Sequence, residues 1–239
     1  MTTTSQTIAA QPVAIHPVRP RGGTALVASA IATIAPFGLS LLVGLAFAGR
    51  VYSSPFSADG TLHDYFAGHQ AMVQTIAFLQ FGSAVGLAVF TCVLWSRLRQ
   101  LASAGSAASY VAAAGGLVAA AFLALNALVQ WVLTRGEVVA QPALVKALNY
   151  FFWILGGPAH TAWLGLLLGG VSLIALRRRL LPRWFSLAGL VVTGLAELSL
   201  LAILTKQVVA FIPLGRFPAL VWLVAASFLL PAGRAAERG

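Results

Sequence analysis

The chain has 239 residues, of which 59% are hydrophobic and only 8% are charged. This charged fraction is about a third of the value usual for a soluble globular domain, so the composition excludes a soluble protein and indicates an integral membrane protein. A net charge of +10 would suggest a nucleic-acid partner for a soluble chain; here the basic residues follow the order of the apolar segments, so we expect no nucleic acid.

Six apolar runs follow a polar, proline-containing segment, residues 1–23. Most runs reach the roughly 20 residues that a helix needs to cross a hydrocarbon core. The sequence therefore predicts an all-α fold, an integral membrane bundle of six transmembrane helices in 24–232, between a disordered cytoplasmic tail, 1–23, and a short cytoplasmic tail, 233–239. The runs lie near 24–49, 71–95, 108–134, 147–176, 184–205 and 208–232.

The basic residues are denser on one side of the predicted membrane than on the other. This bias predicts a multi-pass protein of the cell (inner) membrane with both termini in the cytoplasm. The loop RRRLLPR, 177–183, is the strongest marker, and its charges can also attract the anionic headgroups of membrane lipid. With the amino terminus inside, the inner segments hold Arg19, Arg21, Arg97, Arg99, Arg177, Arg178, Arg179, Arg183, Arg234 and Arg238, and the outer segments hold Arg50, Arg135, Lys146, Lys206 and Arg216.

Glycine and alanine are frequent inside the predicted spans, as in AAAGGLVAAAF, 112–122. Small residues let helix backbones approach closely, and in lipid this packing drives association. Pro36 in the first span and Pro158 in the fourth each remove a backbone donor, so we expect a kink at each.

Two ionisable residues lie deep in the predicted membrane, His160 on the fourth span and Glu197 on the fifth. The helical rise places them about 25 Å and about 21 Å from the basic loop, at nearly the same depth in the outer half. Helical spacing gives each a polar, small or aromatic face. These faces comprise Asn149, Trp153, Gly156, Gly157, His160 and Trp163 on the fourth span, and Ser186, Thr193, Gly194 and Glu197 on the fifth.

Amides of other spans are expected at the same level: Asn126 and Gln130 on the third span, and Gln74 and Gln80 on the second. We therefore predict a polar chamber, opened at Pro158, in the outer half of the bundle. Its candidate catalytic residues are His160 and Glu197, an acid/base pair that requires hydrogen-bond contact. Its candidate ligand-binding residues are Gln80, Asn126, Gln130, Trp153, Trp163 and Arg216, the last reaching toward Glu197 or outward along the surface.

The sequence leaves several functions open. The first is binding of a small apolar or amphipathic ligand, or of a partner helix, in the chamber; the second is a membrane enzyme acting on a lipid-like substrate; the third is a small transporter. Buried amides that only hold helices together are the structural alternative. We expect no cofactor and no metal, because His160 is the only histidine within a span and the spacing of His63, Asp64 and His69 matches no common zinc site.

The segments RRRLLPRWFSLAGLVVTGL and FPALVWLVAASFLL resemble the corresponding parts of an uncharacterised family of six-span bacterial membrane proteins, the domain of unknown function 4386. The resemblance covers about the last four spans and rests on patterns at helix boundaries. It implies six spans and no particular activity.

Overall fold

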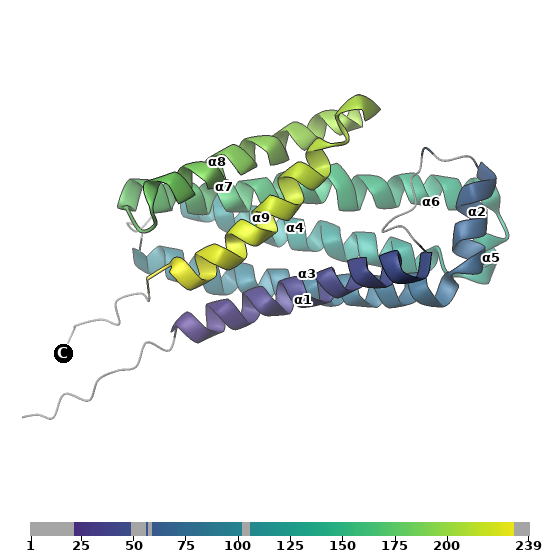
Figure 1. Cartoon of the computed structure of the whole chain (residues 1–239), viewed down its shortest axis with the longest axis horizontal. Helices are drawn as coiled ribbons and strands as arrows, with labels where there is room; N and C mark the ends of the chain where they lie inside the picture. Colours follow the sequence, from purple (N-terminus) through teal and green to yellow (C-terminus); the bar gives the residue numbers. More distant parts are fainter. Residues whose placement is uncertain (1–21, 49–55, 57–58, 102–105, 232–239) are drawn as a thin grey trace, which may run out of the picture.

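The structure is a computed structural model that describes residues 22–48, 56, 59–101 and 106–231. The described residues are almost entirely helical (Figure 1). Most of the two predicted tails, 1–21 and 232–239, lies outside the described residues, and their predicted disorder stays a prediction.

Six helical segments are long and apolar enough to cross a membrane, which confirms the predicted all-α bundle of six spans. They are Gly23–Phe47, Gln70–Leu101, Ala107–Val132, Pro142–Arg178, Arg183–Ile203 and Lys206–Leu229. The structural elements are α1 (Gly22–Ala48), α2 (Asp59–Gly68), α3 (Gln70–Leu101), α4 (Ala107–Val132), α5 (Gly136–Val139), α6 (Pro142–Ile154), η1 (Leu155–Ala159), α7 (His160–Arg178), α8 (Arg183–Leu198), η2 (Ser199–Ile203), η3 (Lys206–Val208) and α9 (Phe211–Leu229).

The spans pack mainly against their neighbours in the chain. α1 lies along α3, α3 along α4, α4 along α7, and α7 along α8, and the final helix α9 contacts α8, α7 and α1. Figure 1 shows α9 crossing the bundle obliquely and ending near the start of α1. We call this end, which also holds the 177–183 loop, the basic end, and we call the opposite end, where α2 and α5 lie, the α2 end.

Small residues set the distance between the central helices. A Cβ atom on Gly115 would lie 2.5 Å from the backbone nitrogen of Leu167, and one on Gly170 would lie 2.5 Å from the carbonyl oxygen of Ala108. These glycines therefore bring α4 and α7 into backbone contact, as the sequence predicted for such a bundle.

The proline inside α1 does not end that helix, which continues through Pro36 to Ala48. A proline removes one backbone hydrogen bond and crowds the preceding turn of the helix. Nearby, the Ser83 hydroxyl of α3 donates a hydrogen bond of 2.7 Å to the Thr33 carbonyl. A side chain of the neighbouring span thus solvates the backbone of this turn, as expected where lipid supplies no water.

The connection between the first two spans contributes a second, smaller core at the α2 end. Leu62, Tyr65 and Phe66 of α2 are buried against residues of α3, α5 and α6. The segment buries its apolar side chains against the ends of the spans rather than folding as a domain of its own, in accord with its short length.

Candidate functional site

The fourth span is one continuous helical segment with a break in its middle. α6 passes into a π-helical turn, η1, and then into α7, and within that turn Gly157 has non-helical backbone angles (φ −86°, ψ −107°). Pro158 supplies no backbone N–H, so the regular hydrogen-bond ladder cannot run through it. The break expected at GGPAH is therefore present as a π-bulge, a feature that is frequent at functional sites.

His160 begins α7 directly after this break and points into the bundle, where it is only 1% exposed. Its Nδ1 lies 2.9 Å from the Ala119 carbonyl oxygen of α4. A carbonyl only accepts, so Nδ1 carries the proton, and in the neutral ring Nε2 is left as an acceptor. The imidazole is thus held in one tautomer by the backbone of α4.

Two predicted amides from different spans meet directly. The Asn126 Nδ2 of α4 donates a hydrogen bond of 3.0 Å to the Gln80 Oε1 of α3, and both side chains are buried. On its other side Asn126 lies against Gly156 of η1, where even a Cβ atom would collide with the carboxamide. Glycine at 156 is therefore required for Asn126 to lie against the π-bulge.

Two acceptors of α4 are buried without a hydrogen-bond partner among the described residues, Asn126 Oδ1 and Gln130 Oε1. The residues are four apart, which places them on one face of α4, one turn from each other. The great majority of buried polar side-chain atoms are hydrogen-bonded, so two open acceptors in succession are unusual. Gln80, Asn126, Gln130, Asn149 and His160, all buried, form what we call the polar cluster.

Glu197 does not join the polar cluster. Its Oε1 lies 2.9 Å from the position of a Cβ on Gly165, so the carboxylate contacts α7 five residues beyond His160. Five residues turn a helix by about 140° and advance it by about 7.5 Å. No ion pair joins Glu197 to His160 in the described part of the chain, so the predicted contact at equal depth is not formed.

Arg216 does not pair with Glu197 either. α9 approaches α8 through Gly215, which packs on Ala196. The next residue, Arg216, is buried on the side of α1, and its guanidinium carbon lies 5.8 Å from the centre of the Phe37 ring. The expectation that it snorkels outward or reaches Glu197 is wrong, because this helix face is turned into the bundle.

The two predicted tryptophans are half-buried and lie at different levels. Trp153 packs edge-on against Phe56 with ring centres 5.4 Å apart, whereas Trp163 packs against the main core. The amide of Gln74 is exposed on α3, away from the polar cluster, so it does not converge with Gln80 as expected.

Arg97, which in the sequence marks only the inner side of the predicted membrane, is buried in the structure. The Arg97 Nε donates to the Pro231 carbonyl at 2.8 Å, and its Nη2 donates to the Leu230 carbonyl at 3.1 Å. Arg97 therefore ties the basic end of α3 to the end of α9. Its position at a helix end gave no sign of this, because the acceptors lie at the other end of the sequence.

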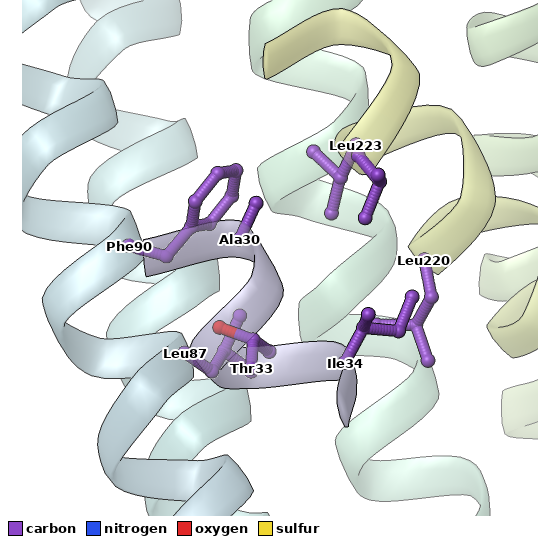
Figure 2. Close-up of a pocket in the computed structure, with 8 residues that line it drawn as sticks. Ala30, Thr33, Ile34, Leu87, Phe90, Leu220 and Leu223 are labelled. Carbon is purple, nitrogen blue, oxygen red and sulfur yellow. The ribbon is translucent and has the colours of Figure 1, made fainter. Parts of the chain in front are cut away.

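Two cavities differ in size and chemistry. The crevice among α1, α3 and α9 in Figure 2 has a volume of about 10 Å³ and is lined mainly by apolar groups, so it is too small for a ligand. Its walls include Ala30, Thr33, Leu87, Phe90, Leu220 and Leu223. A larger groove of about 570 Å³ lies toward the basic end between α4, α7 and α8.

Comparisons of the chain with models of protein families, with curated proteins and with solved structures find no match. The resemblance to the uncharacterised six-span family therefore stays a prediction.

Proposed function

We propose that this multi-pass membrane protein binds a small amphipathic ligand, through a hydroxyl or ammonium group of that ligand, at the polar cluster in the α2-end half of the bundle. The observation that carries the proposal is the pair of buried open acceptors, Asn126 Oδ1 and Gln130 Oε1, one turn apart on α4. A ligand that donates hydrogen bonds to both would offset the free-energy cost of burying them.

The surroundings support a site rather than a simple helix contact. The π-bulge at Gly156 and Pro158 interrupts the wall opposite Asn126, and Gln80 fixes the amide of Asn126 so that its oxygen is oriented. A few oriented polar groups within a bundle of otherwise apolar helices are typical of small-molecule sites.

The acid/base alternative has less support. It needs His160 and Glu197 within hydrogen-bond reach. In the structure His160 is bonded to the backbone of α4, whereas Glu197 of α8 contacts α7 at Gly165. We therefore propose ligand binding rather than catalysis.

The experiment is native mass spectrometry of the purified protein in a mild detergent. We expect a non-covalently retained molecule that carries a hydroxyl or amino group and is released on unfolding. Gln130→Leu removes one open acceptor without breaking a hydrogen bond, and should reduce retention at least about tenfold while the protein stays folded.

Gln74→Leu is the matched control, because Gln74 is an exposed amide of α3 outside the polar cluster. It should retain the molecule fully. Absence of any retained molecule in the unaltered protein, or equal retention by the Gln130 and Gln74 variants, would contradict the proposed function.

A further inference from the structure

The groove near the basic end opens on the lipid-facing side of α7. α4 and α8 form its walls and one face of α7 forms its floor, and the whole space has a volume of about 570 Å³. Val111, one of its lining residues, is 43% exposed on the outer surface of the bundle, where an apolar side chain of a membrane span meets hydrocarbon rather than water. A ligand therefore reaches the groove from within the bilayer.

Small residues make the groove hollow. Gly169 has no side chain on the floor, and Ala107 has only a methyl group on the α4 wall. Thr193 of α8 lines the opposite side, and its Cγ2 lies 2.9 Å from the position of a Cβ on Gly169. From Leu166 to Arg177 the floor is about 16 Å long at the helical rise, about half of a 30 Å hydrocarbon core. The groove thus has the depth of one leaflet.

The charge along the groove is uneven. Arg177 lines its basic end and Ser106 adds a hydroxyl there, whereas no Asp or Glu is among the lining residues. Arg178, Arg179 and Arg183 follow in the adjoining loop. An occupant that complements this groove has an anionic head and an apolar body about one leaflet long.

We propose that the groove binds one anionic phospholipid, with an acyl chain along Gly169 and the phosphate at Arg177 and Ser106. Basic side chains near a membrane surface attract anionic lipids, and a groove lined with small residues adds room for one chain in a fixed place. This site lies in the opposite half of the bundle from the polar cluster and does not depend on the ligand proposed there.

The test measures binding of phosphatidylglycerol and phosphatidylcholine with identical acyl chains to the purified full-length protein, by native mass spectrometry at increasing lipid concentration. We expect phosphatidylglycerol to bind more tightly than phosphatidylcholine. Arg177→Gln should weaken phosphatidylglycerol binding about fivefold and leave phosphatidylcholine binding unchanged, as expected for one cation at the membrane surface.

Matched variants separate a site from diffuse attraction. Arg178→Gln removes an equal charge from a residue that does not line the groove, and should have a much smaller effect than Arg177→Gln. Val111→Trp fills the groove from its exposed edge and should weaken both lipids, whereas Val191→Trp, on an exposed part of α8 outside the groove, should weaken neither.

Equal effects of the two arginine variants would overturn the proposal, as would equal affinity for the two lipids or unchanged binding by Val111→Trp. Thermal unfolding of each variant establishes that it is folded. If Val111→Trp does not fold, Ala107→Phe at another exposed position of the same wall takes its place.

Discussion

The contact between α4 and the fourth span is built differently in its two halves. In the basic-end half, Gly115 and Gly170 allow backbone to meet backbone, and the contact is apolar and close. In the α2-end half, Asn126 lies against Gly156, and His160 is bonded to the Ala119 carbonyl. The first half is held by packing alone, whereas the second uses hydrogen bonds and leaves acceptors open.

This difference separates stability from function along one interface. In lipid, close packing of small residues is a main source of helix association, while one interhelical hydrogen bond contributes only about 0.6 kcal/mol on average. We therefore expect the basic-end half to stabilise the bundle and the α2-end half to tolerate substitution, because its polar groups serve ligand binding.

The largest effect is expected at Gly115. Gly115→Ala should lower the free energy of unfolding by about 2 kcal/mol, since the added Cβ meets the backbone of Leu167, which cannot move as a side chain can. Unfolding of the purified protein in a denaturing detergent measures it. Gly82→Ala is the control: nothing lies within 4 Å of its added Cβ, so it should be neutral or stabilising. Equal losses at both glycines would show that α4 and α7 are not held by close packing.

The next effect tests the hydrogen bonds that join α3 to the end of α9 at the basic end. Arg97→Leu should cost about 2 kcal/mol, because it removes two charge-assisted hydrogen bonds to the Leu230 and Pro231 carbonyls. Arg99→Leu loses only a cation–π contact with Trp95 and should cost about 0.5 kcal/mol. The same denaturation experiment compares them, and similar small losses would mean that the end of α9 is not tied to α3.

A smaller effect tests the hydrogen bond within the polar cluster. Gln80→Leu and Asn126→Leu, alone and combined, form a double-mutant cycle for the 3.0 Å bond between them. We expect a coupling energy of about 0.6 kcal/mol, the average for such bonds in a membrane. Strictly additive losses would show that the two amides do not interact.

The smallest effect is expected at Gln130. Gln130→Leu should change stability by less than about 0.5 kcal/mol, or raise it, because replacing a buried acceptor that has no partner removes an unfavourable group. Thermal unfolding without added ligand checks this. A loss as large as that of Gly115→Ala would assign Gln130 a structural role and remove the contrast between the two halves.

Much of the fold follows from periodicity and the length of apolar runs. The predicted fourth span, 147–176, lies within the structural span, Pro142–Arg178, because the π-bulge interrupts the hydrogen-bond ladder without ending the helix. The burial of Asn149, Gly156 and His160 on one side was also predictable, since a three- or four-residue step keeps side chains on one face.

The pairings between helices could not be predicted in the same way. Residue counts from a loop gave His160 and Glu197 similar depths, but they carry no information on how α8 is rotated against α7. Arg216 was likewise expected to reach toward Glu197 or outward, whereas its burial depends on how α9 crosses the bundle. Gln80 and Asn126, on neighbouring spans, are joined by a hydrogen bond, as expected of amides at the same level.

An experimental structure of the protein in lipid, at a resolution that shows bound small molecules, tests the proposed ligand site most directly. We predict non-protein density within hydrogen-bond distance of both Asn126 Oδ1 and Gln130 Oε1, continuous with an apolar body that extends along the π-bulge. Ordered water alone at these two oxygens, or the two side chains bonded to neighbouring helices with no density between them, would contradict the proposal.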